Sequence, residues 1–377
     1  MKIVLAFDSF KGCLTAEEAC RAAEEGVRRA GFSGEVVCVP LSDGGEGLVL
    51  CFLRTGKAHE VMVRVHGPLM EEVVAKYAIS EDGETAYMEM ASACGLTLVP
   101  VEKRNPLETT TYGLGEMLKD AVERGVKHIV LGIGGSATCD GGMGMLEALD
   151  VWQSTIGEGS APLNRTRRVR QAAPDGYDQS HPTGAILTVA CDVNNPLYGR
   201  EGAAYVFAPQ KGATAEQVVV LDRRLRAFAM ATEEMGWATK EDAFHPGAGA
   251  AGGLGYALLT YLGAELKRGI EVVMEAMVFD EALRGADVVV TGEGCSDEQT
   301  VHGKVAVGVL GRAQALGVKT VLMSGVIKDR EVLEAYGFNR VYGINEGDSR
   351  SLEELMQAEV AKENIRRTCQ RMLEEDL

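Results

Sequence analysis

The chain has 377 residues, a mass of 40.2 kDa, a formal net charge of −17 at pH 7 and a pI near 4.9. This length exceeds what one hydrophobic core usually organises, so we expect two domains. The acidic charge opposes binding to nucleic acid, whose phosphates require a basic surface. It also repels anionic substrates, unless Lys, Arg, backbone N–H groups or a divalent cation attract them locally.

Cysteine usage and apolar runs indicate a soluble protein that does not enter a membrane. Nine cysteines lie between Cys13 and Cys369 without a CxxC pair, which is typical of reduced thiols, so we predict a cytoplasmic location. Only a short apolar run precedes Asp8 and Lys11, which is not a signal peptide. Residues 247–264 carry no charge, but six of them are glycine. We therefore predict a glycine loop that leads into a core helix at 256–262.

Alternating strands and helices are predicted for the first part of the chain. Residues 2–7 form a strand, Thr15 and Glu18 start a helix through a capping box, residues 35–39 form a second strand, and a second helix starts at residue 48. The two strands end in the polar segments AFDSFKG and LSDGGEG. This order is typical of a parallel sheet with helices outside, whose ligands bind at the carboxyl ends of the strands.

The pattern changes after residue 61, where short strands are separated by hairpin turns as far as residue 90. Later strands are predicted at 129–133, 185–191, 287–291 and 320–323, and further capping boxes at Thr214 and Ser351. We predict that residues 1–62 and 287–377 form one α/β domain. Residues 63–286 are expected to form a second α/β domain, with hairpin strands, inserted into the first.

One local pattern recurs, because DGGxG occurs at 43–47 and again at 140–144, each time between a strand and a helix. Glycines let a bound anion approach the backbone, and a helix start directs free N–H groups outward. Carboxylates follow the strands of this type, at Asp8 beside Lys11, Asp43, Asp140, Asp192, and Glu293 near Asp297. Several carboxylates around one pocket require a cation, and Mg²⁺ uses one or two of them while phosphate oxygens fill other positions. The arrangement is suited to phosphoryl transfer.

Motifs of several other enzyme classes are absent from the sequence. It has no GxxxxGK[ST], HExxH or GxSxG, and no HRD with DFG. Gly132, Gly134 and Ala137 satisfy a relaxed dinucleotide fingerprint, so a nicotinamide-dependent hydroxy-acid dehydrogenase is an alternative. Purely structural roles are also open, since the aspartates could cap helices or turns and Lys11 could be a surface lysine.

Eight segments resemble, in order and spacing, those of the type-1 glycerate kinases, which phosphorylate glycerate from ATP: AFDSFKG, LSDGGEG, NPLETTTYG, GIGGSATCDGG, ACDVNNPLYG, FAPQKGA, GAGAAGGLG and TGEGCSDEQT. The resemblance covers residue 1 to about residue 345. It implies two α/β domains, one flavodoxin-like with a parallel sheet and one likened to a restriction-enzyme fold, with the active site in the cleft between them. It also implies ATP and Mg²⁺ as cofactors, D-glycerate as substrate and usually the 2-phosphate as product. We expect a monomer or homodimer whose partners are small molecules.

Roles for individual residues follow from the motifs and the resemblance together. The candidate catalytic residues are Asp8, Lys11, Asp192 and Asp297, of which Asp192 and Asp297 are also candidate ligands of Mg²⁺. The candidates for binding the substrate are Ser9, Asp43, Gly44, Gly45 and Lys304. The candidates for binding the nucleotide are Gly134, Gly135, Ser136, Thr138, Asp140, Gly252, Gly253 and Glu293. The residues alone do not decide which aspartate is the base.

The chain departs from the family pattern at five positions, which are Phe7, Cys139, Cys295, Ser296 and Glu298. The family usually has Pro at position 7, Asn at position 139, and an Arg-Ile-Asp-Gly run at positions 295–298. Loss of the arginine and gain of Glu298 lower the positive charge beside a site for anions. A protein that binds glycerate or ATP without turnover is therefore a further alternative.

Overall fold

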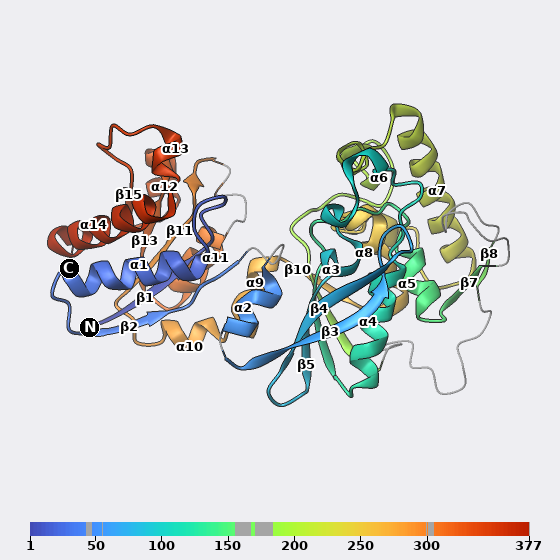
Figure 1. The fold of residues 1–377 in the computed structure, drawn as a ribbon, viewed down its shortest axis with the longest axis horizontal. Coiled ribbons are helices and arrows are strands. Elements are labelled where there is room, and N and C mark those ends of the chain that lie inside the picture. Colours follow the sequence, from blue (N-terminus) through green and yellow to red (C-terminus); the bar gives the residue numbers. More distant parts are fainter. Residues whose placement is uncertain are drawn as a thin grey trace. The chain divides into compact units, whose positions relative to one another are not determined.

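The computed structural model describes residues 1–42, 47–54, 56–154, 167–169, 184–298, 300 and 305–376. The chain separates into two compact units, which we call the terminal unit, Met1–Asp43 with Ile270–Leu377, and the inserted unit, Gly44–Gly269. Both chain ends lie on the terminal unit (Figure 1). These units are defined by compactness alone, and the domain boundaries expected near residues 62 and 286 remain a prediction.

Parallel strands form the sheet of the terminal unit, in the order β15-β13-β11-β1-β2 (Figure 1). Their bounds are β1 Lys2–Phe7, β2 Glu35–Cys38, β11 Val288–Gly292, β13 Lys319–Ser324 and β15 Arg340–Gly343. Numbered in chain order, the sheet reads 2-1-3-4-5, the order of flavodoxin-like folds. In such folds ligands bind where the order reverses, which here is between β1 and β11.

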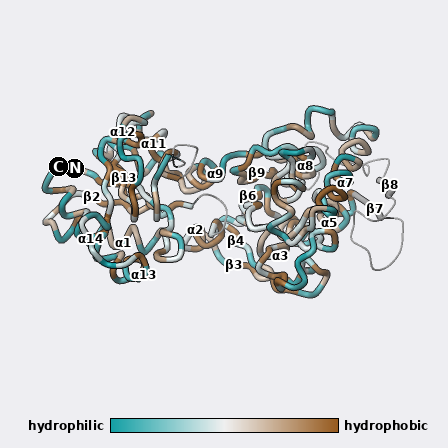
Figure 2. Tube along the Cα trace, turned by 90° about the horizontal axis from the view of Figure 1, so that it is seen from above, coloured by the Kyte–Doolittle hydropathy of each residue, from teal (hydrophilic) through white to brown (hydrophobic). Residues whose placement is uncertain are grey.

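Helices cover both faces of this sheet, because its central strands are apolar on both sides. They are α1 Ala16–Arg29, α9 Gly269–Ala276, α10 Phe279–Leu283, α11 Val305–Ala315, α12 Arg330–Tyr336, α13 Leu352–Leu355 and α14 Ala358–Asp376. Val321 and Met323 belong to the apolar cluster of α1 and α14, whereas Leu322 belongs to the cluster of α11 and α12. The hydropathy of the chain follows this division, with a hydrophobic β13 and a largely hydrophilic α14 (Figure 2).

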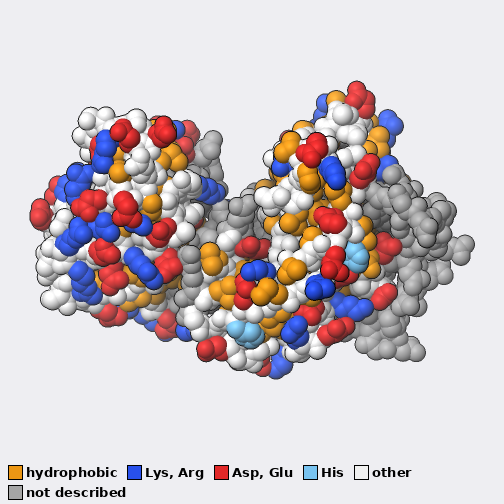
Figure 3. Space-filling model, viewed as in Figure 1, with side chains coloured by type: hydrophobic (Ala, Val, Ile, Leu, Met, Phe, Trp, Pro, Cys, Tyr) orange, Lys and Arg blue, Asp and Glu red, His pale blue; other side chains and the backbone are white. Residues whose placement is uncertain are grey.

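On the face seen in Figure 3, the terminal unit carries acidic and basic side chains intermixed. Ion pairs such as Arg29 with Glu363, 3.2 Å apart, and Arg366 with Glu25, 2.6 Å apart, belong to this unit. The net negative charge of the chain is therefore not gathered into one acidic patch on this face.

The described part of the inserted unit contains a mixed sheet in the order β10-β9-β6-β5-β4-β3. Its strands are β3 Ala58–His66, β4 Glu72–Ser80, β5 Thr85–Glu89, β6 His128–Gly132, β9 Ile186–Ala190 and β10 Glu265–Lys267. The first three strands pair antiparallel as hairpins, which confirms the hairpin prediction, and β5, β6, β9 and β10 run parallel. A short antiparallel pair, β7 Trp152–Ser154 and β8 Arg167–Val169, lies apart from this sheet.

The inserted unit has seven α-helices in its described part, and of these α7 begins with a capping box. They are α2 Leu48–Arg54, α3 Ala91–Cys94, α4 Tyr112–Glu123, α5 Met143–Ala148, α6 Ala203–Phe207, α7 Ala215–Glu234 and α8 Ala250–Leu262. The capping box at Thr214 is present, as are those at Thr15 and Ser351 in the terminal unit. The likeness of this unit to a restriction-enzyme fold remains a prediction.

The glycine segment at the start of α8 is a turn and not a regular helix. Ala251, Gly252 and Gly253 have left-handed backbone angles, with φ of 51°, 72° and 91°. The regular part of α8 follows, and Tyr256 and Leu258 are completely buried in it. This confirms the predicted glycine loop and core helix. Across the described residues, no helix combines the length and apolar character needed to cross a membrane.

We predict that Gly26→Ala destabilises the terminal unit, because α1 packs against α14 through this glycine. A Cβ at position 26 would lie 2.6 Å from the carbonyl oxygen of Arg366 and 2.9 Å from the Cβ of Cys369. Overpacking of this kind costs about 1–3 kcal/mol of unfolding free energy. Urea denaturation followed by circular dichroism measures the change.

Gly311→Ala is the matched control, since Gly311 is an exposed glycine inside α11 and a Cβ on it would meet no described atom within 4 Å. Alanine there should raise the unfolding free energy by roughly 0.5–1 kcal/mol, through helix propensity alone. Equal effects of the two substitutions would show that the contact between α1 and α14 tolerates a methyl group.

Candidate active site

The first candidate site is a cavity of about 600 Å³ in the terminal unit, which we call the terminal cavity. It opens at the carboxyl ends of the parallel strands. Asp8 and Lys11 follow β1, Glu293 and Cys295 follow β11, and Ile344 follows β15. Since β1 and β11 flank the point where the strand order reverses, the cavity lies where a flavodoxin-like sheet binds its ligands.

Asp8 is fixed in this cavity by the backbone on both of its sides. Its N–H donates to the carbonyl of Gly292 at 2.9 Å, which extends the pairing of β1 and β11 by one residue. Its Oδ1 accepts the N–H of Ser9 at 2.6 Å, and the residue is only 7% exposed. Lys11, three residues further along an exposed turn, adds a cation to the same lining.

Glu293 is the second buried carboxylate of the terminal cavity, and hydroxyl groups hold it in place. Its Oε1 accepts from Thr300 Oγ1 at 2.8 Å and from Ser296 Oγ at 3.1 Å. Ser296 Oγ lies 2.7 Å from Ser324 Oγ, which also accepts the N–H of Glu293. Hydrogen bonds to an ionised carboxylate are among the stronger ones, so this network orients Glu293. The departure at Ser296 therefore adds a hydroxyl that supports a site carboxylate.

The other four departures have different surroundings. Phe7 and Cys139 are completely buried in the apolar cores of their units, and burial raises the pKa of the Cys139 thiol to about 12. Cys295 is half-buried and lines the terminal cavity, so a thiol occupies the position of the family's arginine. Glu298 is exposed. Cys295 is thus the departure that changes the charge of the cavity lining.

The second candidate site is a cavity of about 350 Å³ in the inserted unit, which we call the inserted cavity. Gly134, Gly135 and Ser136 enter it from the loop after β6, and Asp192 enters it after β9. Asp192 is exposed, and its Oδ1 accepts the N–H of Gly269 at 2.9 Å. Predicted residues from two strand ends therefore meet in one cavity.

Lys211 is a buried cation of the inserted cavity that the sequence reasoning missed. Its Nζ donates to Ser136 Oγ at 2.6 Å and to the carbonyl oxygen of Thr138 at 2.7 Å. Burial lowers the pKa of Lys211 to about 8, although the nearby Asp140 carboxylate acts in the opposite direction. The motif FAPQKGA contains this lysine, but no periodicity in it indicates burial. Its contacts with residues some 75 positions away come only from the fold.

Asp140 anchors the loop between β6 and α5, residues 133–142, and both of its carboxylate oxygens accept hydrogen bonds. Its Oδ2 accepts from the N–H and Oγ1 of Thr111, both at 2.9 Å, and from the N–H of Gly144 at 3.1 Å. Its Oδ1 accepts the N–H of Gly142 at 3.1 Å. The residue is 1% exposed and is not among those that line the inserted cavity. Asp140 therefore fixes the shape of the loop without entering the lining of the cavity.

Gly252 and Gly253 pack against the loop between β6 and α5. A Cβ on Gly252 would lie 2.1 Å from the carbonyl oxygen of Thr138, and one on Gly253 would lie 2.8 Å from Leu197. The carbonyl of Gly252 accepts the N–H of Gly141 at 3.0 Å. Close approach of two backbone segments therefore explains the glycines, while their neighbours Ala250 and Ala251 line the cavity.

The structure brings together two subsets of the predicted site residues. Asp8, Ser9, Lys11 and Glu293 line the terminal cavity, and Gly134, Gly135, Ser136 and Asp192 line the inserted cavity. Thr138, Asp140, Gly252 and Gly253 lie behind the glycine loop, and Asp297 is not in the lining of the terminal cavity. Asp43, Gly44, Gly45 and Lys304 lie outside the described residues.

The donor atoms of the terminal cavity are suited to a hard cation. Asp8, Ser9 and Glu293 offer oxygen atoms only, which Mg²⁺ and Ca²⁺ prefer. Within the described residues there is no group of three or more His, Cys, Asp or Glu side chains that could hold a metal ion. This leaves room for Mg²⁺, which uses one or two carboxylates. The predicted ligands Asp192 and Asp297 belong to different units and remain a prediction.

The fold defines a two-unit α/β protein in which each unit has a cavity at the carboxyl ends of its parallel strands. The chain belongs to the glycerate kinase family, whose model matches residues 3–375. This confirms the resemblance and the α/β fold class expected from the sequence.

Individual relatives support this membership. The chain is 44% identical to a glycerate kinase of Halalkalibacterium halodurans over 349 residues, which are 91% of this chain and 90% of the relative. It is 42% identical to a glycerate 2-kinase of Escherichia coli over 350 residues, again 91% and 90% of the two chains. A crystal structure provisionally assigned to glycerate kinase 2 of Salmonella typhimurium LT2 superposes with a TM-score of 0.84 at 39% identity, covering 99% of this chain and 97% of that one.

Asp140→Asn should lower the stability of the inserted unit, because an amide N–H₂ would replace one acceptor oxygen and face at least one of four donors. A buried donor without its partner costs about 1–3 kcal/mol. The control Asp150→Asn breaks an exposed ion pair with Lys119, 3.7 Å apart, and should cost less than about 0.5 kcal/mol. Thermal and urea unfolding compare the two variants. An unchanged midpoint for Asp140→Asn would argue against its role as an anchor.

Lys211 should make stability depend on pH between about 8 and 10.5. The unfolded chain keeps this proton up to a pKa near 10.4, whereas the folded chain releases it near 8. The unfolded state therefore binds more protons in this window, and the contribution of Lys211 to stability rises with pH. Relative to Lys211→Met, wild type should gain up to ~3 kcal/mol between pH 7.5 and 10.5.

Urea denaturation of wild type and Lys211→Met at both pH values measures this gain, because titration of other groups cancels in the difference. Lys103→Met, which removes an exposed lysine of the same unit, should show no such trend. A difference between wild type and Lys211→Met that stays constant with pH would show that Lys211 titrates as it does in the unfolded chain.

Proposed function

We propose that this protein phosphorylates D-glycerate from ATP at the 2-hydroxyl, giving 2-phosphoglycerate and ADP, with Mg²⁺ as cofactor. The observation that carries the proposal is the pair of buried carboxylates, Asp8 and Glu293, beside Lys11 at the reversal of strand order in a member of the glycerate kinase family. The names of the relatives support glycerate as substrate, and that of the Escherichia coli relative supports the 2-position.

Asp8 is our choice for the base among Asp8, Asp192 and Asp297. It is the one that is buried in the terminal cavity together with a lysine, and the backbone fixes its carboxylate. In the proposed step the glycerate hydroxyl oxygen attacks the γ-phosphorus and passes its proton to Asp8. The bond from the γ-phosphorus to the bridging oxygen breaks, and ADP leaves. Lys11 supplies the cation for the carboxylate of glycerate.

The loop Gly134–Ser136 is our candidate for binding the phosphates of ATP. It presents glycine backbone in the inserted cavity after a buried strand, as anion-binding loops do. Lys211 ties Ser136 to the carbonyl of Thr138 and so preorganises this loop. Asp192 and Asp297 are the proposed ligands of Mg²⁺. When bound, the ion would neutralise charge on the phosphates.

The alternatives from the sequence differ in their support. Family membership gives no support to a nicotinamide-dependent dehydrogenase. A protein that binds glycerate or ATP without turnover is the second candidate, because Cys295 stands in the terminal cavity where the family usually has an arginine. The cytoplasmic location fits nine free cysteines, and it remains a proposal, as does a monomeric or homodimeric state.

Asp8→Asn should lower kcat for glycerate phosphorylation by about 10²–10³-fold, since it removes a negative charge and a proton acceptor from the reacting centre. The assay couples ADP release to a spectrophotometric readout at saturating Mg²⁺, and ³¹P NMR distinguishes the 2-phosphate from the 3-phosphate. Asp287→Asn is the control, because Asp287 caps the opposite end of the same strand pair through the N–H of Lys2 at 2.7 Å.

Two outcomes would count against the proposal. Wild-type turnover in Asp8→Asn would remove Asp8 from the mechanism. If the wild-type protein binds glycerate and ATP in a calorimeter but forms no ADP, the family fold serves binding alone.

A further inference from the structure

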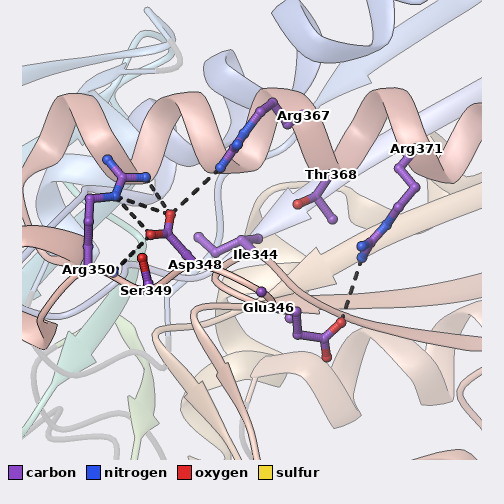
Figure 4. A pocket seen from close by; sticks show the side chains of 10 residues that line it. Ile344, Glu346, Asp348, Ser349, Arg350, Arg367, Thr368 and Arg371 are labelled. Carbon is purple, nitrogen blue, oxygen red and sulfur yellow. Dashed lines mark hydrogen bonds and ion pairs between the residues drawn. The ribbon is translucent and has the colours of Figure 1, made fainter.

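A third cavity, of about 560 Å³, lies in the terminal unit between the loop after β15 and one side of α14 (Figure 4). The loop contributes Glu346, Asp348 and Arg350, and the helix contributes Arg367 and Arg371. We call it the arginine pocket. The functional motifs of the sequence do not include it, and none of the roles proposed above uses it.

The carboxylates in this pocket are each shared by two arginines. Asp348 lies 2.5 Å from Arg350 Nη2 and 3.8 Å from Arg367 Nη2. The hydrogen bonds from Arg350 hold the pKa of Asp348 well below its usual range, so this carboxylate stays ionised. Glu346 pairs with Arg330 and lies 3.7 Å from Arg371 Nη2. Four guanidinium groups therefore share two carboxylates.

Arg371 in particular has unused hydrogen-bonding capacity. Its guanidinium carbon lies 5.1 Å from the centre of the Tyr342 ring, which holds it by a cation–π contact. Its Nε is buried and has no hydrogen-bond partner within the described part of the chain. The hydroxyl of Tyr342 donates to Glu375 at 3.1 Å, which adds a third carboxylate behind the pocket. Glu354 adds a further carboxylate near Arg350. An excess of positive charge is therefore confined to the lining of the pocket itself, where three arginines face two carboxylates.

The same helix shows a balanced arrangement on another side. Arg366 has two carboxylates within reach, Glu25 at 2.6 Å and Glu363 at 3.2 Å. Arg29 pairs with Glu363 as well. Two carboxylates thus serve two arginines there, whereas three arginines face two carboxylates in the lining of the arginine pocket. In a chain of net charge −17, a cavity lined by more arginines than carboxylates is a local exception that attracts anions.

We propose that the arginine pocket binds the dianionic phosphate group of a small molecule, separately from the terminal cavity. Guanidinium forks bind phosphate oxygens in pairs, and a tetrahedral anion presents oxygens to several forks at once. A planar carboxylate has only two oxygens to offer, and those of Asp348 already lie near two arginines, Arg350 and Arg367. The volume exceeds what free phosphate fills, so an organic phosphomonoester fits the pocket as well as the ion itself.

The pocket is distinct from the proposed reaction site but adjacent to it. Ile344 is the residue that both linings share in the described structure. The loop that carries Asp348 and Arg350 continues into α13, whose Leu352 and Leu355 line the terminal cavity. Binding of phosphate in the pocket is therefore separable by mutation from binding in the terminal cavity.

Isothermal titration of the whole protein with inorganic phosphate tests this proposal, with sodium chloride holding the ionic strength constant. We expect a binding component that Arg371→Gln and Arg367→Gln each weaken about tenfold or more, since each removes a charge-assisted contact. Arg29→Gln removes the same charge elsewhere on the terminal unit and should bind phosphate as wild type does. Lys11→Gln should also leave this component unchanged, which separates it from the proposed function.

Glu346→Gln provides a test that does not depend on loss of binding. It removes a competing carboxylate beside Arg371, so phosphate affinity should increase by roughly three- to tenfold at low ionic strength. This gain decides the question even if an arginine variant fails to fold. Unchanged phosphate binding in Glu346→Gln, or in both folded arginine variants, would overturn the proposal. Titration with glycerol 3-phosphate then distinguishes a phosphomonoester, which should bind more tightly, from the free ion.

Discussion

The pairing of β1 with β11 is the contact on which the rest of the terminal unit depends. It joins residues from the two ends of the chain, with Ile3 opposite Val288 and Phe7 opposite Gly292. The ladder continues for one residue beyond β1, where the N–H of Asp8 donates to Gly292. The next residue along that partner strand is Glu293. The register of this pair therefore places Asp8 and Glu293 at neighbouring positions on adjacent strands. If the register shifted by one residue, their side chains would point to opposite faces of the sheet.

Hydrogen bonds from neighbouring groups then decide how each carboxylate is used. Glu293 receives two hydroxyl donors and Asp140 receives four donors, so both are held rigidly. Both carboxylate oxygens of Asp140 accept hydrogen bonds from the protein, whereas Asp8 lies in a cavity lining beside a lysine. Carboxylates that follow buried strands thus have different surroundings, and the difference lies in the tertiary contacts.

Local features could be predicted from the sequence because they depend on neighbours in the chain. The capping boxes at Thr15, Thr214 and Ser351 and the apolar strand of residues 2–7 are of this kind. Loop positions after parallel strands also located Asp8, Glu293 and the loop at Gly134, since strand ends share one edge of a sheet.

Features that arise from contacts between distant parts of the chain could not be predicted from the sequence. The burial of Lys211 depends on Ser136 and Thr138, more than seventy positions away in the chain. The steric need for glycine at position 252 depends on the carbonyl of Thr138. The sharing of two carboxylates by four arginines depends on how α14 lies against the loop after β15. The motifs FAPQKGA and GAGAAGGLG contain Lys211 and Gly252, but no periodicity in the sequence indicates the contacts that these residues make.

The order of strands in the terminal unit also affects how the protein is made. Lys2 and Asp287, which are hydrogen-bonded at the start of the β1–β11 pair, are 285 positions apart in the chain. At roughly 5–20 residues per second, the ribosome takes about 15–60 s to synthesise the partner of the first strand. Throughout that time the apolar segment KIVLAF has an unpaired edge on its β11 side, while the inserted unit can already be complete. Until β11 has been made, this edge of the first strand is open to pairing with another strand.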